Sequence, residues 1–422
     1  MEVIINQRLR LETDIPVLKV EKFRFSWVLG EHGCVDFDGY LNRNVSWRYE
    51  QICEKQIQLY LIESEKVQRI FCGYISQFKT EDVGQTTRFY LQIKSGSVLL
   101  DRESLSRSFQ DIAKSYGEIV REAVQGQSGQ VIRDREIDTE IGFPVICYDE
   151  TPWQFAKRMA DRLGSFVISD IETGRPNLWF GMRQGKEVVP LSEESYTVEL
   201  KPIGKKTGIT YYSEGKSFYK IGDYMKYMGR KVTITGVEGH YEYGDLIFHY
   251  TLEERAFRNV SPQYCGQPSG TGFWGTIQSV KEDRVSIALD IDQKKSTGSY
   301  FYPWYPETGN IMYAMPEKGA RALLHFFGED QQEGAVIHCL NQNTQKRSYK
   351  DRGVKFKDGN YIGLTEESLT LSQGGEHTLS IDDDTVAVNT VKDLNILAND
   401  GIRIKARTLR IDTPEELIIY HG

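Results

Sequence analysis

Apolar and polar residues alternate along much of the first 100 residues. Leu18 and Val20, and then Phe23, Phe25 and Trp27, are spaced by two, the period at which successive side chains of a strand point to opposite faces. Similar segments follow further along, with glycine-containing breaks between them, at 58–62, 69–75 and 89–93. The pattern predicts a β-rich unit, a small barrel, over about residues 1–100.

Between residues 104 and 123 the apolar residues recur every three or four positions. Such spacing predicts a helix with one apolar face, formed here by Leu105, Phe109, Ile112, Ala113, Tyr116, Ile119 and Val120. A second helix is predicted over 152–163, because Pro152 suits a first helical turn and Gly164 suits the position after a last one. The two together predict a helical insert over about 101–199.

Strand alternation returns from residue 200 and predicts a second small barrel over about 200–260. Gly244 and Asp245 form a Gly-X pair that is typical of a two-residue hairpin turn. A turn there would place His240 opposite His249, and Tyr241 opposite Phe248 on the other face.

Residues 261–272 are rich in Pro, Gly and Ser, which predicts a linker. Another compact β unit is predicted after it, within 266–345, with strong strand patterns at 320–327 and 335–340. Together with the linker, these patterns divide the chain into segments 1–265, 266–345 and 346–422.

The last 70 residues carry a repeat of apolar–x–apolar triplets about eight residues apart. The eight triplets are Ile362/Leu364, Leu369/Leu371, Leu379/Ile381, Val386/Val388, Leu394/Ile396, Ile402/Ile404, Leu409/Ile411 and Leu417/Ile419. Their middle residues are small or polar in all but the last triplet, where Ile418 stands. Each triplet predicts one very short strand with an apolar face, followed by a turn.

Two apolar side chains per strand are too few to bury themselves within one chain, and eight residues cannot complete a three-sided turn of a β-helix. Three chains can each supply one side, which predicts a trimeric intertwined β-helix over 346–422. The predicted trimer core consists of Leu369, Leu371, Leu379, Ile381, Val386, Val388, Leu394, Ile396, Ile402, Ile404, Leu409 and Ile411. The alternatives are a flat eight-stranded meander with one apolar face and a disordered acidic tail.

Charge and composition narrow the function. The chain has 52 basic and 60 acidic residues, a net charge of −8, which argues against nucleic-acid binding. No apolar run approaches the roughly 20 residues that span a bilayer, and the first residues do not resemble a Sec-type signal. The six cysteines include no CxxC pair, so buried, reduced thiols in a protein made in the cytoplasm are expected.

Three segments, at residues 150–160, 220–232 and 315–330, resemble the VgrG spike proteins of type VI secretion and the hub and spike of contractile phage tails and related injection systems. Residues 150–160, ETPWQFAKRMA, are similar to the family's hub helix, and Lys220-Ile221-Gly222-Asp223 with Gly229-Arg230-Lys231-Val232 resembles the opening of its second hub barrel. Residues 315–330, MPEKGARALLHFFGED, are similar to its OB-fold barrel core. The order of these segments and the C-terminal repeat covers nearly the whole chain.

The resemblance implies a mainly β fold with a few helices: a hub of two small barrels, an OB-fold collar and a trimeric β-helical spike. It further implies a homotrimer that meets a hexameric tail tube, baseplate proteins, effector cargo and a PAAR-type tip protein, and that touches the target membrane only transiently. Since Ile418 breaks the repeat just before the end, the docking site predicted for the tip protein is Leu417, Ile418, Ile419, Tyr420 and His421.

No catalytic residue, metal site or cofactor is predicted. About 20 residues separate the last barrel strand from the repeat, too few for a glycosidase domain. His240 and His249, beside Glu242, could be metal ligands, but an exposed polar face is the simpler interpretation. The turn 382–384 could bind calcium and the aromatic run 301–305 a sugar, but a solvated corner and a packed loop are favoured.

The sequence thus predicts the trimeric central spike and baseplate hub of a contractile injection system, which adapts a three-fold spike to a six-fold tube and punctures the target envelope. The alternatives are a β-helical envelope-degrading enzyme, either a lyase or a hydrolase, and a receptor-binding tail fibre.

Overall fold

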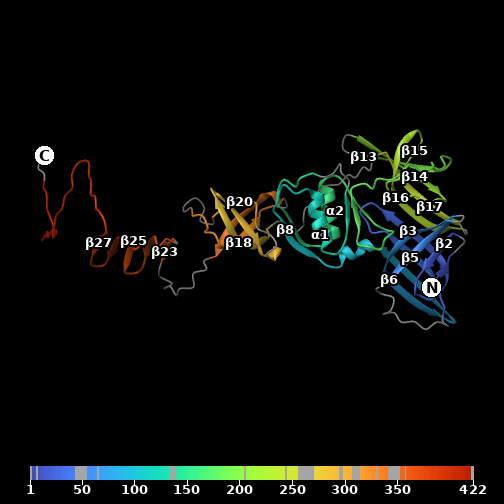
Figure 1. Cartoon of the computed structure of the whole chain (residues 1–422), viewed down its shortest axis with the longest axis horizontal. Helices are drawn as coiled ribbons and strands as arrows, with labels where there is room; N and C mark the ends of the chain where they lie inside the picture. Colours follow the sequence, from blue (N-terminus) through green and yellow to red (C-terminus); the bar gives the residue numbers. More distant parts are fainter. Residues whose placement is uncertain are drawn as a thin grey trace. The chain divides into compact units, whose positions relative to one another are not determined.

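The computed structural model divides into two compact units, Met1–Gln342 and Asn343–Gly422 (Figure 1). The residues that it describes are 2–5, 8–42, 55–63, 66–133, 139–203, 206–242, 245–254, 270–293, 298–306, 314–328, 331–340, 352–356 and 358–419. Most of them lie in strands, as predicted. In this part of the chain none of the helices combines the length and the apolar character that crossing a bilayer requires.

In the described part of the first unit, twelve strands form one antiparallel sheet in the order β1-β2-β5-β6-β7-β4-β3-β16-β17-β14-β13, with β15 on β16. The two predicted hub barrels are therefore continuous, because β3 pairs with β16 along Arg24–Val28 and Gly236–His240. The strands are β1 Glu2–Ile4, β2 Leu9–Glu12, β3 Val17–Val28, β4 Cys34–Leu41, β5 Gln56–Glu63, β6 Lys66–Val83, β7 Thr86–Ser95, β13 Tyr196–Ile203, β14 Lys206–Gly215, β15 Tyr224–Tyr227, β16 Arg230–Glu242 and β17 Asp245–Glu253.

Alternation explains why this sheet encloses a core. Phe23, Phe25 and Trp27 of β3 are buried, as the two-residue spacing predicts. Phe25 meets Phe71 and Phe248 edge-on, so the seam between the two halves of the sheet lies within one shared aromatic core.

The insert is mixed rather than purely helical. It contains the strands β8 Leu105–Phe109, β9 Val131–Arg133, β10 Val145–Glu150, β11 Val167–Ser169 and β12 Leu178–Phe180, and the helices α1 Tyr116–Gln125 and α2 Pro152–Arg162. The predicted helix over 104–123 is wrong in its first half, where β8 pairs with β10. Helix α1 begins only after Ser115, whose side chain forms a capping box with Glu118.

The second helix confirms its prediction. Thr151 caps α2 by accepting a hydrogen bond from the Gln154 amide, Pro152 is in the first turn, and Gly164 follows with a φ of 62°. The buried faces of α1 and α2 pack in one core, in which the rings of Phe109 and Phe155 stack.

The predicted register of the hairpin between β16 and β17 is shifted by two residues. Glu242 pairs with Asp245, Tyr241 with Leu246 and His240 with Ile247, so the turn does not use Gly244 and Asp245 as its two central residues. A shift of two leaves every side chain on its predicted face, because strand side chains alternate with a period of two.

A five-stranded sheet, β20-β19-β18-β21-β22, forms the last part of the first unit. Its two end segments approach each other, since Trp304 forms an isolated parallel bridge with Val336 and the Tyr305 amide donates to the Val336 carbonyl at 2.9 Å. This curled sheet, called the barrel below, is consistent with the predicted OB fold. Its strands are β18 Gly272–Lys281, β19 Arg284–Leu289, β20 Phe301–Pro303, β21 Arg321–Phe326 and β22 Gly334–Leu340.

The second unit contains one antiparallel five-stranded meander: β23 Arg352–Lys355, β24 Tyr361–Leu364, β25 Ser368–Gln373, β26 His377–Asp382 and β27 Val386–Asn389. The triplets at 362, 369, 379 and 386 lie in these strands. The four later triplets, from 394 to 419, were predicted as strands, but in the single chain the structure assigns them to none.

Candidate functional site: an exposed apolar face on the C-terminal sheet

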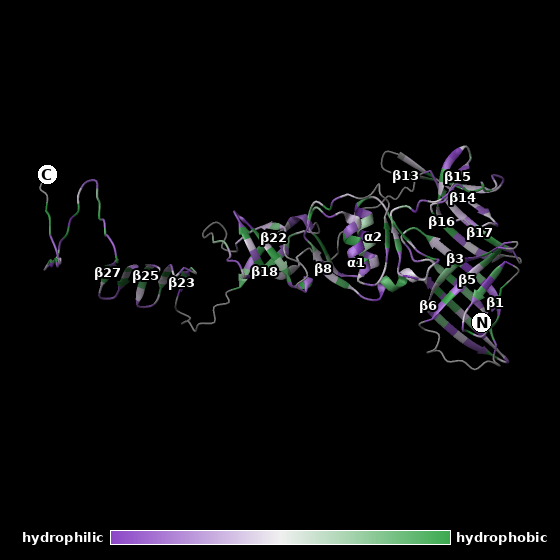
Figure 2. Ribbon diagram, in the orientation of Figure 1, coloured by the Kyte–Doolittle hydropathy of each residue, from purple (hydrophilic) through white to green (hydrophobic). Residues whose placement is uncertain are grey.

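The register of the meander brings the apolar triplets into line. Ile362 and Leu364 pair with Leu371 and Leu369, and these in turn pair with Leu379 and Ile381. The last two pair with Val388 and Val386. Directly paired residues point to the same face of a sheet, so one face is aliphatic from β24 to β27, and Figure 2 shows hydrophobic residues recurring along these strands.

This face is open in the single chain. The exposed fractions of Ile362, Leu364, Leu369, Leu371, Ile381, Val386 and Val388 range from 38% to 69%. Contiguous exposed aliphatic surface marks an interaction site on most proteins. Since burying one Leu or Ile side chain is worth about 1.5–3 kcal/mol, covering the face would stabilise the tail strongly.

The short strands are set by their turns. In the turn after β26, Asp382 Oδ1 accepts hydrogen bonds from the amides of Asp384 and Thr385, at 3.0 and 2.6 Å. The turn before β25 is stabilised in a similar way, because Thr365 Oγ1 accepts a hydrogen bond from the Ser368 amide at 3.0 Å. Hydrogen bonds to the Thr385 hydroxyl and to these amides lower the pKa of Asp382. The acidic corner is therefore a side-chain-stabilised turn.

The second half of the predicted core is exposed as well. Leu394, Ile396, Ile402, Ile404, Leu409 and Ile411 are 56–70% exposed and belong to no strand. At the predicted tip, Leu417, Ile418 and Ile419 are exposed by 56%, 54% and 81%. Tyr420 and His421, which complete that prediction, lie outside the described residues.

A second site joins the ribbon β8–β10 to the five-stranded barrel. Ile146 and Ser108 are directly opposed in the ribbon, and both turn main-chain groups outward. Gln331, of the short helix η5 (Gln331–Glu333), accepts from the Ile146 amide at 3.0 Å and donates to its carbonyl at 2.9 Å. Asp292, at the end of η4 (Asp290–Asp292), accepts from the Ser108 amide and hydroxyl at 2.5 and 2.7 Å. Two buried barrel side chains thus bind the two outer edges of the ribbon.

Apolar packing supports the same joint. The Ile146 side chain lies in the barrel core, and the ring of Tyr148 meets Phe273 edge-on. Val145 and Cys147, which flank Ile146 in β10, point to the opposite face, into the core of the insert. Three successive buried apolar residues indicate a strand covered on both faces, and this sequence signal was overlooked.

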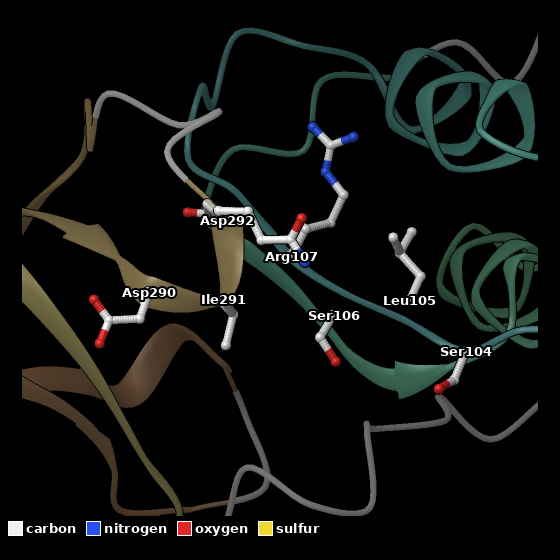
Figure 3. Close-up of a pocket in the computed structure, with 8 residues that line it drawn as sticks. Ser104, Leu105, Ser106, Arg107, Asp290, Ile291 and Asp292 are labelled. Carbon is white, nitrogen blue, oxygen red and sulfur yellow. The ribbon is translucent and has the colours of Figure 1, made fainter.

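A pocket beside this joint is lined by residues 104–107 and 290–293 (Figure 3). Its charged side chains are already paired within the protein. Arg321 donates to both carboxylate oxygens of Asp290, and Arg107 pairs with Glu122 at 3.1 Å. In Figure 3 the Arg107 guanidinium points away from Asp290. The pocket therefore presents no cluster of charge that would define a ligand.

The remaining candidates from the sequence are the aromatic run, the histidine pair and the cysteines. In the aromatic run 301–305, Tyr302 and Trp304 are buried, so the segment is packed as expected, but residues 301–303 form the strand β20 and not a loop. His240 and His249 do meet, with their Nε2 atoms 3.5 Å apart. The side chain of Glu242 lies outside the described residues. Cys34, Cys72, Cys147 and Cys339 are free thiols.

Comparison with known proteins matches residues 32–199 to the model of a family described as the phage tail baseplate hub. The match covers less than half of the chain and shows a likeness to baseplate hub proteins over that segment. The matched segment includes most of the first half of the large sheet, the insert and the start of β13. A search of curated protein sequences gives no match.

Solved structures extend the likeness beyond the hub domain. The E. coli c3393 protein, a component of the type VI secretion system described as similar to the T4 tail proteins gp27 and gp5, has a TM-score of 0.53 at 14% identity and covers 78% of this chain and 98% of its own. A chain of the lidless PdpA-VgrG complex has a TM-score of 0.55 at 11% identity, over 88% of this chain and 93% of its own. The half-lidded Francisella complex also gives 0.55, at 10% identity, over 88% and 83%.

These values show a shared fold, and with the hub domain they confirm the resemblance to VgrG-type spike proteins that the sequence predicted.

Proposed function

We propose that three copies of this chain form the central hub and spike of a contractile injection apparatus. The baseplate hub domain supplies the attachment to the tail, and the C-terminal segment 346–422 supplies the spike. The single observation that carries the proposal is the aligned aliphatic face of β24–β27, which is exposed in one chain and needs a cover.

The role is mechanical, and we propose that it involves no chemical step. In a trimer of intertwined tails, each aliphatic face would be covered by the tails of the other two copies, and the triplets from 394 to 411 would find strand partners between chains. Interchain hydrogen bonds and a shared core would make the spike stiff enough to be driven through an envelope without unfolding.

The partners follow from the same arrangement. The hub would meet the tail tube and baseplate proteins, and the exposed end at Leu417, Ile418 and Ile419 would dock a PAAR-type tip protein. The solved VgrG structure in complex with PdpA supports an additional cargo or accessory protein for this chain. Assembly would take place in the cytoplasm, and the particle would then be expelled or released.

Light scattering on the purified full-length chain tests the trimer, which should have about three times the chain mass of 48.5 kDa. Leu371→Asp places a charge on the aliphatic face and should yield monomers. Thr370→Asp is the matched control, because Thr370 is the neighbour on the same strand that points to the opposite face. A wild-type monomer, or equal behaviour of the two variants, would contradict the proposal.

The receptor-binding alternative makes a different prediction. If the exposed tip residues recognised a cell surface, the full-length chain would bind specific glycans on an array, and Ile418→Asp would abolish that binding. Ile418→Asp should instead weaken only the capture of a tip protein if the tip serves assembly.

A further inference from the structure

Two histidines from neighbouring strands lie in contact on the polar face of the large sheet. The Nε2 atoms of His240 on β16 and His249 on β17 are 3.5 Å apart, and the rings stack with centroids 4.6 Å apart and planes within 4°. The His249 side chain is 42% exposed, so solvent reaches the pair. Neither imidazole belongs to the joint or to the aliphatic face described above.

The nitrogen–nitrogen distance suits a transition-metal ion. Two nitrogens that each lie about 2.0–2.1 Å from a tetrahedral zinc ion are about 3.4 Å from one another. The lone pairs of two parallel rings do not converge, so each imidazole must turn about its Cβ–Cγ bond to face a common ion. That torsion has only a broad preference, and neither ring is fully buried.

Carboxylates flank the pair in the sheet register. His249 lies between Glu214 on β14 and Glu238 on β16, one directly opposite on each side. Glu214 Oε2 is 3.9 Å from His249 Nδ1, the ring nitrogen that does not face His240. A carboxylate at that nitrogen favours the tautomer that leaves Nε2 free for a metal. Glu238 is exposed and lies directly opposite His249, on the same face of the sheet.

The positively charged Arg24 lies near the histidine pair, and a carboxylate lies beside it in the sheet register. Arg24 on β3 lies directly opposite His240, and Asp36 on β4 lies opposite Arg24. Asp36 thus places one negative charge beside Arg24, and the two glutamates add negative charge around His249.

We propose that His240 and His249 bind one divalent transition-metal ion per chain, with Glu238 or water completing its shell and Glu214 as a positioning residue. Among the described residues, no three His, Cys, Asp or Glu side chains are already arranged to hold a metal, so the site closes around the ion as the rings turn. Imidazole ligands select zinc, nickel or copper over magnesium and calcium. The ion would cross-link β16 and β17 where β16 pairs with β3, at the seam of the sheet.

The test uses the full-length chain without a histidine tag. Calorimetric titration with Zn²⁺ should give one site per chain, weakened at least tenfold in His240→Ala and in His249→Ala. His325→Ala, on the barrel, is the control and should bind as the wild type does. Glu214→Gln should weaken binding about 10- to 100-fold without changing the stoichiometry, as expected for a residue that orients a ligand.

A spectroscopic measurement separates this site from other ligands. With Cu²⁺, the electron paramagnetic resonance spectrum should show hyperfine coupling to imidazole nitrogens that is lost in the double variant His240→Asn/His249→Asn, which keeps polar side chains on the face. Unchanged coupling or equal Zn²⁺ affinity in a double variant whose circular dichroism matches the wild type would overturn the proposal, as would the absence of saturable binding in the wild type.

Discussion

Gln331→Ala tests whether the barrel and the β8–β10 ribbon form one joint. The Gln331 side chain is almost wholly buried and binds both main-chain groups of Ile146. After truncation, the Ile146 carbonyl still accepts from Arg158, at 2.8 Å, but its amide loses the partner that Gln331 supplies. A buried donor left unpaired costs about 1–3 kcal/mol, so opening of the joint should become that much easier.

Hydrogen exchange of the Ile146 amide measures this cost at the site. A loss of 1–3 kcal/mol corresponds to exchange that is about 5- to 150-fold faster, since about 1.4 kcal/mol is a factor of ten. Mass spectrometry of a peptide covering 145–150 reports it in the full-length chain. Gln331→Met fills most of the space without the hydrogen bonds, and therefore separates the lost bonds from the cavity.

Glu333→Ala is the matched control, because Glu333 lies in the same short helix with its side chain exposed. It should leave exchange in β10 unchanged. If Gln331→Ala also left it unchanged, or accelerated exchange equally in every strand, the inference that Gln331 locks the edge of this ribbon would be refuted.

Three further changes probe the first unit. Thr151→Ala removes the cap of α2 and should lower the free energy of unfolding by about 0.5–2 kcal/mol in urea titrations, whereas Thr151→Ser should change it little. Arg321 lowers the pKa of Asp290, so their ion pair stabilises the fold above the unfolded pKa near 4, and this stabilisation is lost as the pH falls through the lower folded pKa. Asp290→Asn should therefore cost under about 1 kcal/mol at pH 7 and progressively less as the pH falls below the unfolded pKa, measured by thermal unfolding across pH. Gly298→Ala should lower the melting temperature through a cost of at least about 1–2 kcal/mol, because Gly298 has a φ of 61° and a Cβ there would lie 2.5 Å from the main chain of Ile287; an unshifted melting temperature would contradict this.

The sequence predicted those features that depend on interactions between residues close together in the chain. The alternation of Phe23, Phe25 and Trp27 and the cap of α2 depend on near neighbours, and both predictions are confirmed. The helix over 104–123 failed because two elements were joined into one apolar period. The capping box of Ser115 and Glu118 marks the real start of the helix, and it was visible in the sequence.

Contacts between distant segments could not be predicted in this way. Gln331 and Ile146 are 185 positions apart, and a glutamine carries no sign that it will bind a strand edge. The β16–β17 register was also undetermined, because the residues around Gly244 offer two neighbouring positions for a two-residue turn. The faces were still predicted correctly, and for that reason His240 and His249 meet despite the shift.

The spacing of the tail indicates what kind of surface can cover it. Strand pairing in the single chain ends at Asn389, although the apolar triplets continue with the same spacing to residue 419. A surface that buries this face must present aliphatic side chains at intervals that match the repeat over its whole length. A mismatch would leave some triplets exposed to solvent and others packed against polar groups. An unrelated globular partner would need such a repeat of its own, whereas another copy of this segment has the same spacing because it has the same sequence. The repeat therefore favours self-association over docking to a different protein.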